Sequence, residues 1–173
     1  MFWVLIIVAS LGALVMIVAL VGMALPEAHV ASGALILPQS PQSIWQAISD
    51  FAGQTKWRAD LKRVERLPDL NGHEVWLEEF QRGMRIPLET IESDPNWRLV
   101  RRIADDNLPF GGVWEYNITP TNEGWCQLTI TERGRVRNPI FRFMSRFVFG
   151  HTATIESYLS SLAKSFGENP AIK

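Results

Sequence analysis

The stretch Trp125–Phe143, WCQLTITERGRVRNPIFRF, contains the two signals that decide the fold. In its first half a period of two places the apolar side chains on one face, as in a half-buried strand: Cys126, Leu128 and Ile130. Its second half starts a helix, with Asn138 as N-cap and Pro139 at the first helical position, where its missing N–H costs nothing. The sequence therefore predicts a strand that leads directly into a helix.

The predicted helix is long. Its apolar residues recur at steps of three or four: Ile140, Phe143, Met144, Phe147, His151, Ile155, Tyr158, Leu159, Leu162 and Phe166. This spacing predicts one continuous helix of about 27 residues. Gly167 is expected to end it.

Upstream of this stretch the sequence predicts a strand, a short helix and a run of further strands. Ser40 and Pro41 mark the start of the short helix, and Asn71-Gly72 and Asp94-Pro95-Asn96 mark tight turns. The predicted strands are residues 29–37, 61–67, 73–80, 84–91, 97–104, 113–119 and 125–133. This order indicates an α+β fold in which an antiparallel sheet of six to seven strands carries its helices on one face. Since one helix does not cover a curved sheet of this size, a cavity is expected between them.

The N-terminal segment Phe2–Leu25 has 24 residues and a single polar side chain, Ser10. As a helix it covers about 36 Å, enough for a hydrocarbon core about 30 Å thick. A signal peptide would have a basic start and a shorter apolar run, and a buried core helix would show a polar face. We therefore predict a single-pass transmembrane anchor, residues 1–26. The ligand-binding domain is expected at 27–169, with a tail at 170–173.

Charge and cysteine content exclude several classes of function. All 17 basic and 18 acidic residues lie at or after Glu27, and the net charge of −1 gives no support for a nucleic-acid partner. Lys56 is the first basic residue after the anchor, so the positive-inside rule gives no orientation. Cys126 is the single cysteine, and neither HxxxH nor HExxH occurs, so we expect no disulfide and no metal. Walker A, GxGxxG and GxSxG motifs are also missing, and no cofactor is expected.

The order of elements resembles the SRPBCC superfamily, which includes START-type lipid-binding domains and polyketide cyclase/dehydrase-like proteins. The resemblance rests on SPQSIW at 40–45, GVWEY at 112–116, and LTITE at 128–132 leading into NPIFRF at 138–143. It covers roughly His29 to Gly167 and looks most like the bacterial cyclase/dehydrase-like branch. The resemblance implies a helix-grip fold with a deep hydrophobic pocket. It supplies no universal catalytic motif, and the transmembrane helix lies outside the common domain.

Aromatic residues and methionine are the candidates for lining an apolar pocket: Trp76, Phe80, Trp114, Tyr116, Phe143, Met144 and Phe147. The alternative is that they pack a solid core.

Five arginines lie between Glu132 and Glu156, a stretch without an acidic residue. Arg142 and Arg146 are one helical turn apart and are predicted to contact an anion, either a membrane headgroup or an acidic group on the ligand. The alternative is a solvated face with salt bridges to other strands.

The weak candidates for catalysis are Glu78, Tyr116 and His151. Glu78 shares a strand face with Trp76 and Phe80, and inside the domain it would have acid/base potential. We expect it instead at the sheet rim, and we expect His151 to pack in the core.

These patterns predict a membrane-anchored protein that binds a lipid or another hydrophobic small molecule. The first alternative is an enzyme of the cyclase or dehydratase type that uses acid/base residues in the cavity. The second is an interaction module for a membrane partner.

Overall fold

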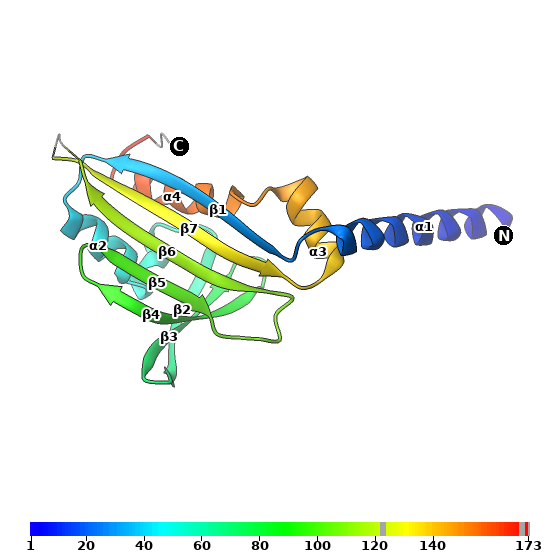
Figure 1. Ribbon diagram of the computed structural model, residues 1–173, viewed down its shortest axis with the longest axis horizontal. Coiled ribbons are helices and arrows are strands. Elements are labelled where there is room, and N and C mark those ends of the chain that lie inside the picture. Colours follow the sequence, from blue (N-terminus) through cyan, green and yellow to red (C-terminus); the bar gives the residue numbers. More distant parts are fainter. Residues whose placement is uncertain (122–123, 170–171, 173) are drawn as a thin grey trace.

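A computed structural model describes residues 1–121, 124–169 and 172 of the chain. Helix α1 (Phe2–Ala24) projects from one end of an α+β domain (Figure 1). Of the predicted tail at 170–173, only Ile172 lies within the described residues, and it forms an isolated bridge with Leu35.

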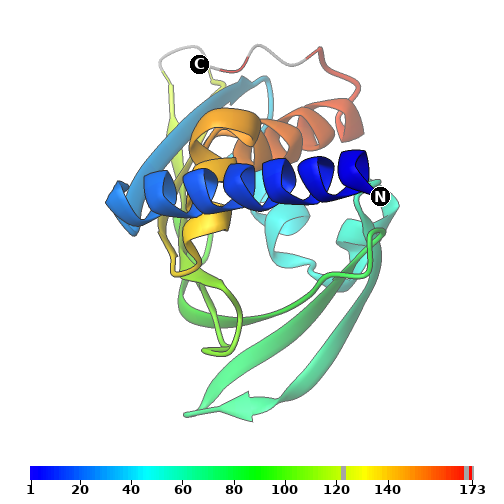
Figure 2. The ribbon, with the colours of Figure 1, turned by 90° about the vertical axis from the view of Figure 1, so that its right-hand side faces the viewer.

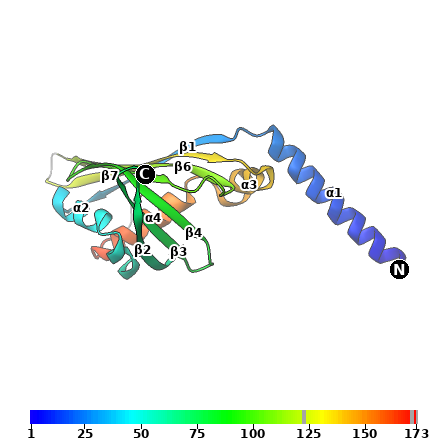
Figure 3. The same ribbon diagram turned by 90° about the horizontal axis from the view of Figure 1, so that it is seen from below.

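The domain is built on a seven-stranded sheet in which every pair of neighbours is antiparallel. Its order is β1-β7-β6-β5-β4-β3-β2, so β1 and β2 are the edges. The strands are β1 (Ala28–Leu37), β2 (Leu61–Leu70), β3 (His73–Phe80), β4 (Arg85–Asp94), β5 (Arg98–Ile103), β6 (Phe110–Pro120) and β7 (Cys126–Val136). The sheet curls, and the helices of the domain lie within its concave side (Figures 2 and 3). All seven predicted strands are confirmed, with ends shifted by at most three residues.

Capping residues set the start of the short helix as predicted. Helix α2 (Pro41–Ser49) begins after Ser40, whose hydroxyl accepts a hydrogen bond from the Ser43 amide at 3.1 Å. A short 3-10 helix, η1 (Ala52–Lys56), follows and leads into the edge strand β2. Both lie at the end of the domain opposite α1 (Figure 1).

The C-terminal helix is not continuous, and the prediction of one uninterrupted helix is wrong. It consists of α3 (Pro139–Met144), a π-helical turn η2 (Ser145–Phe149) and α4 (Ala153–Ser165). Gly150 separates the last two with a φ of 77°, a left-handed conformation that favours glycine. The break lets α3 pack against α1 while α4 lies against the sheet (Figure 1). The predicted start is confirmed, because the Asn138 side chain accepts from the Ile140 amide at 2.9 Å.

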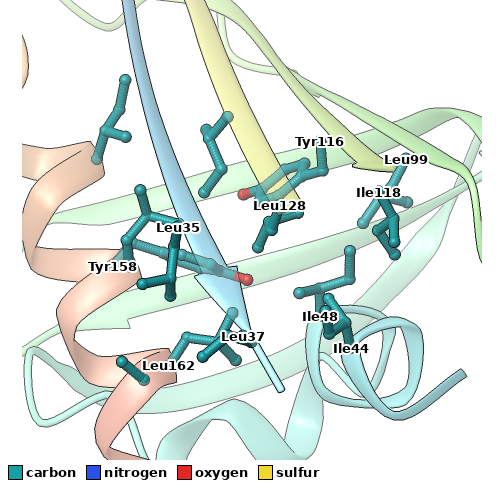
Figure 4. Packing of buried hydrophobic residues seen from close by; sticks show 14 of the residues in the cluster. Leu35, Leu37, Ile44, Ile48, Leu99, Tyr116, Ile118, Leu128, Tyr158 and Leu162 are labelled. Atoms are coloured by element: carbon teal, nitrogen blue, oxygen red, sulfur yellow. The ribbon is translucent and has the colours of Figure 1, made fainter. Parts of the chain in front are cut away.

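The core lies between the concave face, α2 and α4. Leu35 and Leu37 of β1 meet Tyr158 and Leu162 of α4, and Ile48 of α2 packs beside them (Figure 4). These side chains are almost fully buried. The alternation of buried positions on β1 and β7 places one face of each strand in this core.

Helix α1 is docked on the domain at its C-terminal end. Gly22 is its one buried residue, and a Cβ atom there would overlap the Pro139 carbonyl oxygen. Arg142 of α3 donates to the Leu25 carbonyl at 2.9 Å, which neutralises the negative end of the helix dipole. The chain therefore leaves α1 through a fixed junction.

Candidate functional site

A pocket of about 340 Å³ lies at the junction between α1 and the domain. Its walls come from the segment after α1, the start of β1, the end of β7 and the α3–α4 region: Leu25, Pro26, Glu27, Ala28, His29, Val30, Val136, Arg142, Arg146 and His151. Small-molecule pockets commonly measure roughly 300–1,000 Å³. We call this space the junction pocket. It combines an apolar floor with cationic side chains.

A second pocket of about 130 Å³, which we call the inner pocket, lies beside it, between the end of β7, the start of β6 and the α3–α4 region. His29 and His151 border both pockets. Their rings stack at a centroid distance of 4.2 Å and an interplanar angle of 25°. The stacked pair therefore stands between the junction pocket and this inner pocket.

Glu132 of β7 lines the inner pocket, and its Oε1 lies 3.6 Å from His29 Nε2. Burial raises the pKa of Glu132, partly offset by a hydrogen bond from Trp114. Burial, and then the neighbouring His151, lower the pKa of His29. The surroundings thus disfavour the charged form of both groups, which is a setting suited to proton exchange.

A second polar group, which we call the deep cluster, lies at the centre of the concave face. Glu78 accepts from Arg58 at 2.9 Å and from Arg101 at 2.7 Å. All three residues are at most 6% exposed. Asp60 pairs with the other nitrogens of Arg58, and Gln54 accepts from the same guanidinium at 3.1 Å. Two cations and two carboxylates therefore balance in charge, with Glu78 buried between the arginines and Asp60 partly exposed.

Two tyrosines line the deep cluster. The ring centroids of Tyr116 (β6) and Tyr158 (α4) are 5.6 Å apart, and Arg58 lies over the Tyr158 ring at 5.1 Å. Burial raises the pKa of Tyr116 to about 12 and that of Tyr158 well above its usual value. Both phenols therefore stay neutral at ordinary pH and are weaker acids than an exposed tyrosine.

The predicted catalytic residues do not form one site. Glu78 is buried in the deep cluster, so the expectation that it lies at the sheet rim is wrong. Tyr116 is packed beside it, and neither lines the junction or inner pocket. His151, expected in the packed core, lies at the wall of both pockets.

The predicted lining residues lie elsewhere than the two pockets. Five are partly buried and one is buried, on the concave face and on α3: Trp76, Phe80, Trp114, Phe143, Met144 and Tyr116. The Phe147 ring is tilted against Phe143 at a centroid distance of 4.9 Å but is 59% exposed. None of the seven lines the junction or inner pocket, so the concave interior holds an aromatic lining that is mostly packed.

The arginines divide into two groups. Arg133, Arg135 and Arg137 are exposed and pair with Glu115, Glu27 and Asp106, as a solvated face would. Arg142 and Arg146 line the junction pocket. Arg142 is largely buried, whereas Arg146 is exposed.

Sequence reasoning missed Glu132, His29 and Arg101 as site residues. The alternation of β7 could have identified Glu132, because Glu132 follows Ile130 on the same face of the strand. The same rule places Arg101 inward with Leu99, but a buried arginine is rare enough that the pattern alone did not suggest it. Among the residues that the structure describes, no three His, Cys, Asp or Glu side chains converge to hold a metal.

Comparisons with known proteins agree with this geometry. A family model described as polyketide cyclase / dehydrase and lipid transport matches residues 31–166. No curated protein sequence is significantly similar to the chain.

Solved structures share the architecture at low sequence identity. A conserved protein from Geobacillus kaustophilus is 17% identical, with a TM-score of 0.66 over 83% of this chain and 99% of that one. A START superfamily protein from Mycobacterium smegmatis is 16% identical, with a TM-score of 0.61 over 79% and 96%. Norcoclaurine synthase from Thalictrum flavum is 14% identical, with a TM-score of 0.61 over 82% and 88%. At these identities the likeness shows the fold alone.

Proposed function

Because the chain belongs to the polyketide cyclase / dehydrase and lipid transport family, we propose that it binds a lipid or other hydrophobic small molecule while anchored to a membrane by α1. The observation that carries the proposal is the position of the junction pocket, which lies where α1 meets the domain. A ligand leaving the bilayer beside α1 would reach this pocket first.

The anchor is supported by length and composition. Helix α1 has 23 residues, a mean hydropathy of 3.1 over its most apolar window, and no burial of that window inside the protein. At 1.5 Å per residue it covers about 35 Å, against a hydrocarbon core of about 30 Å. Tethering would also raise the local concentration of the domain at its ligand source.

The surface beside the docked end of α1 fits the interfacial region of a bilayer. Four apolar side chains of α3 and η2 are exposed there: Ile140, Phe141, Phe147 and Val148. Arg146 lies among them and also lines the junction pocket. Aromatic and aliphatic groups next to cations are typical of segments that lie among lipid headgroups. Arg142 and Arg146 are therefore our candidates for headgroup contact.

Blocking the junction pocket tests the proposal. Ala28 lines it, so Ala28→Trp should fill it, whereas Ala52→Trp at an exposed position of η1 provides a matched control at the far end of the domain. The full chain would be purified in detergent, extracted with organic solvent and examined by mass spectrometry for retained lipid. Stoichiometric lipid with the wild type and Ala52→Trp, and a loss with Ala28→Trp, would support the proposal. Equal retention by all three would contradict it.

A second candidate function is proton transfer, favoured by the contact of Glu132 with His29 beside His151 in the inner pocket. The cyclase and dehydratase chemistry named in the family description requires an acid/base group next to a carbonyl substrate. Exchange of the α-hydrogens of acetophenone in heavy water, followed by NMR, would test it. The full chain should accelerate exchange and Glu132→Gln should not. Equal rates with both chains would exclude this role for Glu132.

A further inference from the structure

The deep cluster contains one cation whose hydrogen bonds are incomplete. Arg101 uses Nη1 for Glu78, but its Nε and Nη2 are buried without a partner among the described residues. Arg58, in contrast, uses its Nε, Nη1 and Nη2 on Asp60, Gln54 and Glu78. The Nε–Nη2 edge is one side of the guanidinium fork that binds a carboxylate through two parallel hydrogen bonds.

The unused edge of Arg101 is held in a fixed position. Glu78 fixes one end of the guanidinium, and the Phe51 ring lies against its face at 4.0 Å. A side chain that is 2% exposed and restrained in this way presents its donors in one direction. Preorganised donors of this kind lose little conformational freedom when an acceptor arrives.

Two hydroxyl groups nearby also lack partners. Thr90 lies directly opposite Arg101 in the β4–β5 register, and its Oγ1 is buried without a partner among the described residues. The Tyr158 hydroxyl is also buried without a partner among the described residues. The Tyr158 ring lies against the guanidinium of Arg58, and Arg58 and Arg101 both pair with Glu78. Of the five unpartnered buried side-chain atoms in the described part of the chain, four thus belong to Thr90, Arg101 and Tyr158.

Buried polar groups in proteins nearly always have a hydrogen-bond partner, so a concentration of unpartnered donors calls for an acceptor. An arginine nitrogen only donates, and a hydroxyl does so readily. The surroundings of these donors are apolar and aromatic: Phe51, Trp76, Leu99, Trp114 and Tyr116. An acceptor that carries a long apolar body matches both features.

We propose that Arg101, Thr90 and Tyr158 form a subsite for the carboxylate end of a hydrophobic ligand. This inference rests on the proposed binding function and narrows the ligand to an amphipathic carboxylic acid. The Arg101 edge takes both carboxylate oxygens, and the two hydroxyls donate to their remaining lone pairs. Because the aromatic side chains of the concave face are mostly packed without a ligand, they move apart to admit its apolar body.

The test compares a carboxylate with its neutral ester. Tryptophan fluorescence of the full chain in detergent would be titrated with dodecanoate, methyl dodecanoate and inorganic phosphate. Detergent micelles take up part of each ligand, to the same extent for every variant. The affinity of a variant for a ligand is therefore expressed relative to the wild-type affinity for that ligand. Arg101→Lys keeps the charge but loses the fork, and should weaken dodecanoate about tenfold. The same variant should leave methyl dodecanoate within about twofold.

Two further variants keep the proposal testable if Arg101→Lys does not fold. Thr90→Val and Tyr158→Phe remove hydroxyls that have no partner, so the ligand-free variants should melt at or above the wild-type temperature. Both should still weaken dodecanoate selectively. Thr119→Val, at an exposed position of β6, is the matched control and should change neither affinity.

The outcomes separate the subsite from the binding function. If both ligands bind and no variant distinguishes them, the carboxylate subsite is wrong and the binding function stands. If phosphate alone binds and depends on Thr90 and Tyr158, the site takes a free oxyanion and the inference is overturned. If neither dodecanoate nor its ester binds the wild type, the proposed function itself fails.

Discussion

On the concave face, Glu78 accepts hydrogen bonds from two arginines, whereas at the α1 end Glu132 lies 3.6 Å from His29 in the wall of a pocket. The first carboxylate is held by groups that stay charged. The second has a raised pKa and a partner whose pKa is lowered, so both tend to be neutral. A buried carboxylate therefore occurs in two different settings in this fold. One fixes the structure, and the other leaves a titratable group at a pocket.

The largest expected effect comes from breaking the buried pairing. Glu78→Gln leaves Arg58 and Arg101 without their shared carboxylate, and loss of one partner from a buried ion pair costs about 3–5 kcal/mol. Glu79→Gln removes an exposed contact with Lys62 and should lower the free energy of unfolding far less. Denaturant titration of the full chain measures both values. Equal effects would show that the deep cluster contributes no more than a surface ion pair.

An intermediate effect is expected at the docked end of α1. Gly22→Ala places a methyl group against Pro139, and overpacking of this kind costs about 1–3 kcal/mol. Gly12→Ala meets no atom within 4 Å and is the matched control. Spin labels at Ser10 and Ser157 would report the distance between α1 and α4. The distribution should broaden for Gly22→Ala alone, and an unchanged one would mean that α1 is not docked in solution.

The smallest expected effect is a pH dependence of the free energy of unfolding, caused by the groups at the α1 end of the domain. The pKa of His29 is lowered from 6.5, so the folded state binds fewer protons than the unfolded chain below that pH. Stability from this group is present above pH 6.5 and is lost as the pH falls towards the folded pKa. His29→Gln should remove this loss from the pH profile of unfolding.

Glu132 should give the opposite sign. Its pKa is raised from 4.5, so its contribution is complete below that pH and is lost as the pH rises through the folded value. Glu132→Gln should therefore remove the loss of stability that the wild type shows as the pH rises through this pKa. Parallel profiles for the two variants would contradict the environments described for these groups.

Local patterns predicted most of the fold. The caps at Ser40 and Asn138, the Asn71-Gly72 turn and the period of two along the strands were enough to indicate an antiparallel sheet with its helices. The resemblance to the SRPBCC superfamily added the helix-grip arrangement. The break at Gly150 was not predictable, because apolar residues keep helical spacing on both sides of it. What decides the break is that α3 and α4 pack against different partners, and that is a tertiary effect.

The site was less predictable because it is assembled from distant residues. Arg58, Glu78 and Arg101 come from three parts of the chain, and each alone looks like an ordinary surface charge. Their burial depends on meeting one another, which no local window records. Glu132, in contrast, could have been found by extending the alternation of β7 by two residues.

Photo-crosslinking from the bilayer tests the central claim most directly. The full chain would be reconstituted in nanodiscs that contain a lipid with a diazirine in its acyl chain, and labelled peptides would be mapped by mass spectrometry. The account predicts labels on His29, Val136 and other walls of the junction pocket, reduced in Ala28→Trp and unchanged in Ala52→Trp. Labels confined to α1 and the exposed side chains of α3 and η2 would contradict it.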